Sequence, residues 1–138
     1  MKIFIFGKTG QLGGQLYSQG VDLKNKVTGF SHKELDITNR KSVEKILKKF
    51  SPDVVLNATA YHVVSDCEVY PDKAFLVNTI AVRDLAQICQ NLNVRFVHYS
   101  TDYIFDGKKG SPYGEDDLPS PVQTYGVSKV AGEYMALS

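Results

Sequence analysis

The feature that most constrains the fold is a glycine-rich turn directly after a short apolar segment. Ile3–Phe6 is apolar throughout, and it is followed by Gly7, Gly10 and Gly13. An amphipathic pattern then predicts a helix from about Gln11 to Gln19. Glycine permits positive φ and close backbone approach, and the first turn of a helix offers free N–H groups to an anion. Strand, turn and helix in this order predict a site for a dinucleotide pyrophosphate.

The segment Gly7-Lys8-Thr9 also resembles the end of a P-loop. That motif requires a glycine five residues before Gly7, where this sequence has Lys2, so the P-loop is excluded. A plain structural turn without a ligand is the simpler alternative, and the turn alone does not decide against it.

Strands and helices alternate along the chain, and the strands are apolar almost throughout. This pattern predicts an α/β, Rossmann-like, doubly wound parallel sheet in three α/β/α layers. Residues 1–138 are expected to form one domain that lacks later strands and a C-terminal substrate domain. A loop over Asp102–Pro121, rich in Gly, Pro and Asp, is too long to be a mere connection. The other expected strands are Lys26–Phe30, Val54–Leu56 and Val94–Tyr99; the other expected helices begin at Thr38 or Asn39, at Pro71 and at about Pro121.

The end of the second strand bears on the choice of cofactor. In dinucleotide folds an acid often stands there and binds the ribose hydroxyls, but this strand is followed by Ser31, His32 and Lys33. Ser31 and Lys33 are suited to a 2′-phosphate, which favours NADPH over NADH. That they are solvated loop residues is the alternative, and it stays open.

Tyr125 and Lys129 are four residues apart in the last predicted helix, so their side chains share a face. An ammonium near a phenol favours the phenolate and brings its pKa toward neutrality. Such a pair suits proton delivery to a carbonyl oxygen while a nicotinamide supplies hydride. Thr101, at the end of the fourth strand, is a candidate for orienting that carbonyl, although a hydroxyl there also suits a simple turn cap.

Charge and cysteine content exclude several classes of protein. Sixteen basic and fifteen acidic residues give a formal charge of +1 without a charged block, which gives no support for a nucleic-acid or membrane partner. The first apolar run is too short for a signal peptide or a membrane span. Cys67 and Cys89 lack metal or disulfide spacing, so no metal site is expected. We expect a reduced, soluble, cytoplasmic protein.

Longer blocks of sequence carry a resemblance to a known family. The chain resembles the N-terminal part of the extended short-chain dehydrogenases, and within them the dTDP-4-dehydrorhamnose reductases. The resemblance implies NAD(P)H-dependent reduction of dTDP-4-dehydro-6-deoxy-L-mannose to dTDP-L-rhamnose, a step toward cell-surface polysaccharide. The matching blocks are Phe6–Gly13, Leu35–Thr38, Asn57–Tyr61, Val77–Asn78, Tyr99–Gly107 and Tyr125–Glu133.

The resemblance also implies roles for single positions. Thr101, Tyr125 and Lys129 would be the catalytic set, with Tyr125 as proton donor and Thr101 orienting the sugar C4 carbonyl. Thr101 and Asp102 would touch the sugar. Gly10, Gln11 and Leu12 would contact the cofactor's pyrophosphate, and Asp36 and Ile37 its adenine. The further half of the cofactor would be lined by Ala60, Tyr61 and Tyr99.

The sequence departs from the family pattern at two positions and in length. Ser65 stands where an acid is usual and His62 where Thr is common, so His62 is either a cofactor-site residue or a solvent-facing loop residue. His98, inside a strand, is expected to be packed. Because family members continue into a domain that binds the sugar nucleotide, we expect this chain to be a fragment that binds dinucleotide weakly and reduces nothing measurably.

Two other functions fit the same blocks. One is a non-catalytic regulatory subunit similar to the β subunit of methionine adenosyltransferase; the other is a sugar-nucleotide epimerase or dehydratase. Thr101 and the glycine turn favour the reductase. The expected partner is a nucleotide sugar in the full-length enzyme, and an exposed sheet edge would allow a homodimer.

Overall fold

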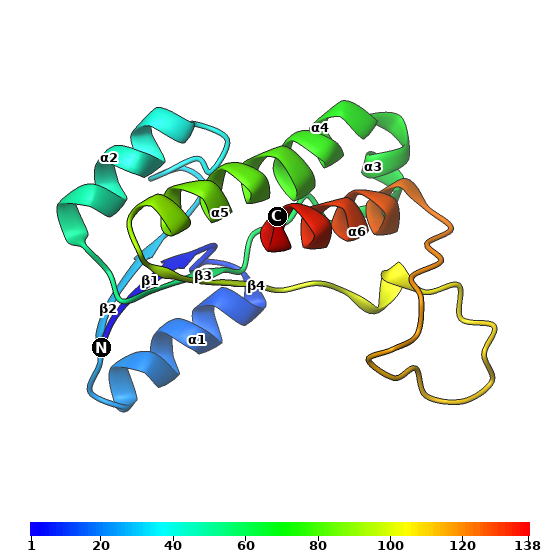
Figure 1. The fold of residues 1–138 in the computed structure, drawn as a ribbon, viewed down its shortest axis with the longest axis horizontal. Coiled ribbons are helices and arrows are strands. Elements are labelled where there is room, and N and C mark those ends of the chain that lie inside the picture. Colours follow the sequence, from blue (N-terminus) through cyan, green and yellow to red (C-terminus); the bar gives the residue numbers. More distant parts are fainter.

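The computed structural model describes all residues, 1–138, as a parallel four-stranded sheet with helices on both faces (Figure 1). The strand order is β2-β1-β3-β4. Val55 of β3 lies beside Phe4 of β1 on one side and beside Phe96 of β4 on the other. The strands are β1 (Lys2–Phe6), β2 (Lys26–Phe30), β3 (Val54–Asn57) and β4 (Arg95–His98). The predicted Rossmann-like parallel sheet is confirmed.

The two faces of the sheet carry different helices. Helix α1 (Gln11–Asp22) packs against β1 and β2 on one face, while α2 (Arg40–Phe50), α5 (Ala81–Asn91) and α6 (Thr124–Leu137) lie on the other (Figure 1). The main core lies between the sheet and α2 and α5. Its fully buried side chains include Phe4, Phe6, Val43, Leu47, Val55, Leu85 and Ile88.

The helix expected to begin at Pro71 is interrupted by a wider turn. Pro71 opens α4 (Pro71–Phe75), a π-helical turn follows over Leu76–Ile80, and α5 follows directly, so that the three segments form one continuous helix. A short helix that the sequence did not predict, α3 (Val64–Val69), precedes it. π-turns occur mostly as single insertions and often at functional sites. This one places Asn78 and Thr79 toward α6.

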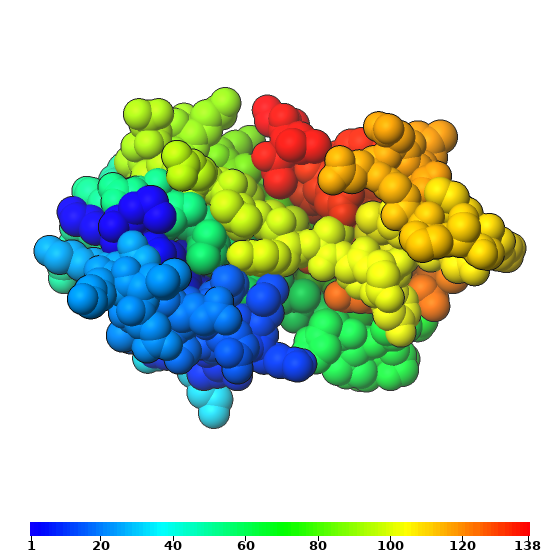
Figure 2. Space-filling view, turned by 90° about the horizontal axis from the view of Figure 1, so that it is seen from below, coloured from blue at the N-terminus to red at the C-terminus, as the bar shows by residue number.

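The strand ends and the long loop meet at one end of the molecule. The segment after β4 begins with a short 3₁₀ turn (Asp102–Ile104) and then projects beyond the sheet (Figures 1 and 2). The last helix begins at Thr124, three residues later than expected. Residues 105–123, which precede it, form no helix or strand. No helix in the structure is long and apolar enough to cross a membrane.

Candidate active site

The glycine turn is tightly packed around Gly7 and Gly13. Gly7 has φ +85°, which favours glycine, and its N–H donates to the Phe30 carbonyl at 2.9 Å. A Cβ on Gly13 would lie 2.1 Å from the Gly7 carbonyl oxygen. Gly10 is the N-cap of α1, so the free N–H groups of Gln11 and Leu12 begin the helix at this turn. Side chains at Gly7 and Gly13 are therefore sterically excluded.

A hollow of about 320 Å³ lies beside the glycine turn, between the segment after β2 and the segment after β3. Four residues that were predicted to contact the cofactor line this hollow together. Its lining consists of Asp36, Ile37, Ala60 and Tyr61, with His32, Leu35, Thr59 and Val77. The structure leaves His62 exposed and outside this lining.

The end of β2 holds a carboxylate that sequence reasoning missed. Glu34 accepts from the backbone N–H and hydroxyl of Ser31, at 2.8 and 2.7 Å, and from the Lys8 ammonium at 2.9 Å. These hydrogen bonds, led by the Ser31 N–H, lower the pKa of Glu34 to about 2. The N–H and hydroxyl of Ser31 are therefore already hydrogen-bonded to a carboxylate of the protein, that of Glu34. A Ser-x-x-Glu spacing, the pattern of a capping box, was the available sequence signal.

Thr101, Asp102 and Tyr125 meet just beyond β4. Thr101 caps the 3₁₀ turn by accepting from the Tyr103 N–H at 3.3 Å, and its hydroxyl donates to Asp102 at 3.2 Å. The Tyr125 ring packs edge-on against Tyr103, with centroids 5.6 Å apart. The nearby Thr101 side chain lowers the pKa of the Tyr125 phenol. The structure thus brings the predicted catalytic hydroxyls together.

The helix that carries Tyr125 is fixed at its start by a side chain from another helix. Glu68 of α3 accepts from both the N–H and the hydroxyl of Thr124, each at 2.7 Å. Gln123, at the N-cap, makes no side-chain capping bond. A carboxylate near a helix N-terminus is favoured by the helix dipole. Glu68 therefore sets where α6 begins.

Asn78, in the π-turn, fixes the middle of the site. Its Oδ1 accepts from the Tyr61 N–H at 2.8 Å, and its Nδ2 donates to the Tyr61 carbonyl at 3.0 Å and to Ser128 Oγ at 3.0 Å. Asn78 is 1% exposed, and a buried amide is costly unless its partners are present. It joins the cofactor-side segment at Tyr61 to α6.

Lys129 is buried, 2% exposed, and its ammonium group reaches the end of β4. It donates to the Tyr99 carbonyl at 2.5 Å, and its Nζ lies 3.2 Å from His98 Nε2. Burial lowers the pKa of Lys129 to about 8. Tyr99, predicted to line the cofactor site, here contributes its carbonyl oxygen.

The structure does not show the expected lowering of the Tyr125 pKa by Lys129. Burial raises the pKa of Tyr125, and the Thr101 hydroxyl opposes that effect only in part. The hydrogen bonds of Lys129 go instead to β4. Tyr125 is thus held as the neutral phenol, which is the form that can donate a proton.

His98 makes the stability of the fold sensitive to acid. Burial, and then the charge of Lys129, lower its pKa from 6.5 to about 4. Between these values the unfolded chain binds a proton at His98 and the folded chain does not, so acidification favours unfolding. We expect about 2 kcal/mol of the free energy of unfolding to be lost across this window.

Urea denaturation of the wild type and of His98→Gln at several pH values measures this loss. Between pH 6.5 and 4, the free energy of unfolding should fall less steeply with decreasing pH in His98→Gln than in the wild type. His62→Gln is the matched control, because that side chain is exposed. Equal slopes in all three proteins would show that His98 does not carry the effect.

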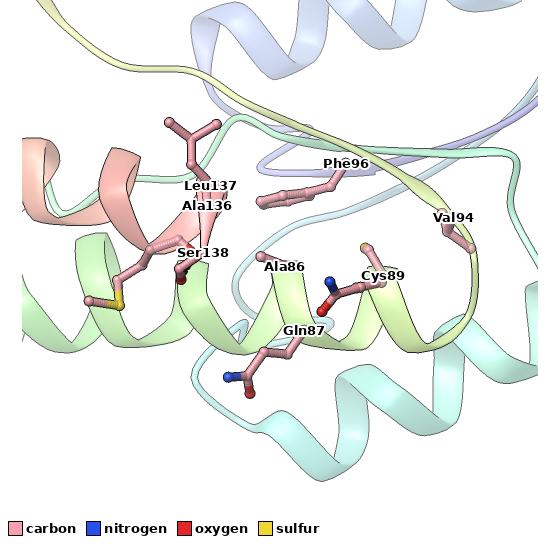
Figure 3. A pocket seen from close by; sticks show the side chains of 10 residues that line it. Ala86, Gln87, Cys89, Val94, Phe96, Ala136, Leu137 and Ser138 are labelled. Atoms are coloured by element: carbon pink, nitrogen blue, oxygen red, sulfur yellow. Dashed lines mark hydrogen bonds between the residues drawn. The ribbon is translucent and has the colours of Figure 1, made fainter.

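A second cavity, of about 210 Å³, lies away from these residues (Figure 3). Its lining comes from α5, from the start of β4 and from the last turn of α6, and includes Cys89, Phe96 and Leu137. Burial raises the pKa of Cys89 to about 12, so this cysteine is an unreactive thiol. The cavity offers no chemistry to the site at the strand ends.

The fold and its relatives place the chain in the extended short-chain dehydrogenase class, with a Rossmann-like α/β sheet. The whole chain, residues 1–138, matches the RmlD substrate binding domain family and belongs to it.

Known relatives are of two kinds, curated sequences and solved structures. The dTDP-4-dehydrorhamnose reductase of Salmonella typhimurium is 39% identical over 96% of this chain and 46% of its own length. A probable low-salt glycan biosynthesis reductase of Haloferax volcanii is 38% identical over 97% of this chain and 48% of its own length. The chain therefore spans about half the length of these relatives.

Two solved dTDP-4-dehydrorhamnose reductases share the fold closely. The enzyme of Clostridium acetobutylicum matches with a TM-score of 0.95 and 36% identity, over 99% of this chain and 49% of its own. The enzyme of Bacillus anthracis, solved in complex with NADP, matches with a TM-score of 0.94 and 34% identity, over the same shares. A Thermus thermophilus UDP-glucose 4-epimerase, 21% identical, shares the fold alone.

Proposed function

We propose that this chain is the dinucleotide-binding part of an NAD(P)H-dependent reductase. The proposed reaction reduces dTDP-4-dehydro-6-deoxy-L-mannose to dTDP-L-rhamnose. One observation carries the proposal: on α6, the buried Tyr125 lies near Thr101 and the buried Lys129 reaches the Tyr99 carbonyl, at the strand ends that also hold the glycine turn. In open parallel sheets, ligands bind at this edge. The identity of the relatives supports the substrate.

The residues of the chain divide the proton chemistry between them. A nicotinamide dinucleotide, when bound, would supply the hydride for the sugar C4. Tyr125 would give its phenolic proton to the C4 carbonyl oxygen, which completes the alcohol. The raised pKa of Tyr125 keeps that proton available at neutral pH. Thr101 orients the carbonyl, and Lys129 holds the nicotinamide ribose. Asp102, adjacent to Thr101, contacts the sugar.

The cofactor residues fit a dinucleotide on steric grounds. The close contact between Gly7 and Gly13 leaves no room for side chains, which is what direct approach of a pyrophosphate to Gly10, Gln11 and Leu12 requires. The neighbouring hollow is lined by Ile37, Ala60 and other apolar groups and is suited to an adenine.

Glu34 is expected to control the choice between NADPH and NADH. Its carboxylate occupies the Ser31 N–H and hydroxyl, the groups proposed for a 2′-phosphate. A 2′-phosphate must displace this charge, whereas Glu34→Gln removes it and keeps the size of the side chain. We expect the variant to raise the NADPH-to-NADH affinity ratio roughly fivefold, a modest effect because the site is exposed to solvent.

Titration of the purified chain with NADPH and NADH, followed by nicotinamide fluorescence, measures this ratio. Glu115→Gln is the matched control, because it removes the same charge from the exposed loop. An unchanged ratio in Glu34→Gln would remove Glu34 from cofactor selection. Absence of binding by the wild type would contradict a complete dinucleotide site in this chain.

We further propose that the chain by itself binds dinucleotide weakly and gives no measurable turnover. The relatives are about twice as long, and in that family a further domain binds the sugar nucleotide. Without it, the reacting groups lose the benefit of proximity, worth roughly 7–11 kcal/mol in well-oriented systems. Turnover of the sugar nucleotide by these 138 residues would refute this.

A further inference from the structure

The ring of Tyr125 packs on α3 and α4 rather than on the main core. It forms a small buried cluster with Cys67 of α3 and Ala74 of α4, both fully buried. Tyr61 and Val64 pack against this cluster. None of these residues belongs to the main core between the sheet, α2 and α5. The position of the ring therefore depends on where α3 and α4 lie.

Glu68, the next residue of α3 after Cys67, holds the backbone beside this ring. Its Oε1 accepts from the Thr124 N–H and its Oε2 from the Thr124 hydroxyl, each at 2.7 Å. Hydrogen bonds to a carboxylate are strong, and two of them to one neighbour fix its orientation as well as its distance. Gln123, at the N-cap, adds no side-chain bond. The first turn of α6 is thus anchored to α3 at Thr124.

The anchor and the ring contacts act on one side chain. Thr124 directly precedes Tyr125, and the planar peptide between them carries the position of one residue to the next. Two side-chain torsions then lead to the ring, and the buried cluster restricts them. We propose that Glu68 is a positioning residue: by holding Thr124, it sets the place from which the Tyr125 hydroxyl gives its proton. The inference rests on the proposed function, in which Tyr125 is the proton donor.

Helix α3 is also tied to the cofactor side of the site. Cys67 Sγ donates to the Tyr61 carbonyl at 3.4 Å, and Tyr61 lines the hollow beside the glycine turn. Glu68 itself does not line that hollow. Loss of its carboxylate should therefore displace Tyr125 relative to the cofactor and leave dinucleotide affinity unchanged.

The exposure of Glu68 separates this role from a contribution to folding. The side chain lies at the surface, so its truncation opens no cavity, and exposed charged contacts add little stability. Glu68→Ala is therefore expected to fold. Asp66→Ala is the matched control, because Asp66 is exposed on the same helix and its carboxylate hydrogen-bonds only Ser65.

NMR of the 138-residue chain tests the position of Tyr125 without cofactor or substrate. The wild type should show NOE contacts from the Tyr125 ring to the Ala74 methyl and to the Tyr103 ring, whose centroid is 5.6 Å away. We expect Glu68→Ala to weaken both contacts and Asp66→Ala to keep them. Unchanged contacts in Glu68→Ala would overturn the proposal.

Glu68→Gln is the conservative variant that should restore the position of Tyr125. Its amide oxygen still accepts from the Thr124 N–H, and its NH₂ donates to the Thr124 hydroxyl. We expect this variant to keep both NOE contacts. Their loss in Glu68→Gln as in Glu68→Ala would contradict positioning through these two hydrogen bonds.

Kinetics of a protein that joins this chain to the substrate-binding part of its relatives test the consequence for the reaction. Glu68→Ala should lower kcat about tenfold, since misplacement by 1 Å can cost about 10²-fold, with unchanged dinucleotide affinity and recovery in Glu68→Gln. A parallel loss of kcat and dinucleotide affinity would show a structural role only and overturn the proposal. If the wild type gives no turnover while the NOE contacts change as expected, the proposed reaction fails and the placing of Tyr125 by Glu68 stands.

Discussion

Gly132→Ala is expected to destabilise the fold by about 3 kcal/mol or more, or to prevent folding. A Cβ at this position would lie 2.1 Å from the Asn78 carbonyl oxygen. Neither partner can move easily: Asn78 is in the π-turn and its amide binds Tyr61 and Ser128. Thr79 also donates to the Ser128 carbonyl at 2.8 Å. Separating α6 from the turn would break these buried bonds.

Gly14→Ala on α1 is the matched control. A Cβ there would meet only the Lys8 carbonyl oxygen, at 3.4 Å, and alanine is favoured over glycine within a helix by up to ~1 kcal/mol. Urea denaturation of both variants compares the two effects. A Gly132→Ala protein as stable as Gly14→Ala would show that α6 does not pack against the π-turn as described.

Tyr125→Phe is expected to reduce turnover about a thousandfold in a protein that joins this chain to the substrate-binding part of its relatives. Positioned proton donors contribute about 10²–10⁴ to rates. The change removes one oxygen from a side chain that is 9% exposed. Because the ring and its contact with Tyr103 remain, the fold and the dinucleotide affinity should change little.

Steady-state kinetics with NADPH and the sugar nucleotide measure this loss, and fluorescence titration measures cofactor affinity in parallel. Tyr103→Phe is the control, because it removes the same atom from the neighbouring ring, which is 41% exposed. If Tyr125→Phe keeps more than about a tenth of the rate, the proton comes from another group.

The sequence was most informative where one local rule decides the structure. The glycine turn predicted both β1 and the start of α1 at Gln11, and Asn39 caps α2 by accepting from Ser42 N–H at 3.1 Å. Ser51 ends that helix with φ +45°, before Pro52. Tyr125 and Lys129 share a helix as expected. In each case, neighbouring residues set the backbone geometry.

The parts that the sequence did not reveal depend on contacts between distant segments. A π-turn does not follow from side-chain spacing, and Asn78 shows its role only when α6 is in place. His98 was expected to be simply packed, yet its partners are Asn57 and Lys129. Glu34 was not predicted because it lies beyond Ser31, His32 and Lys33, the residues that directly follow β2. Its side chain reaches Ser31 only because the chain folds back over these three residues.

The carboxylate of Glu68 at the start of α6 also constrains the order in which the site can assemble. Without Glu68, the first turn of α6 lacks the side-chain acceptor that fixes it, since Gln123 supplies none. Starting a helix is its most costly step. Tyr125 should therefore reach its final place only after α3 has formed and docked. In hydrogen exchange we expect the amides at the start of α6 to gain protection together with those of α3, as one cooperative unit.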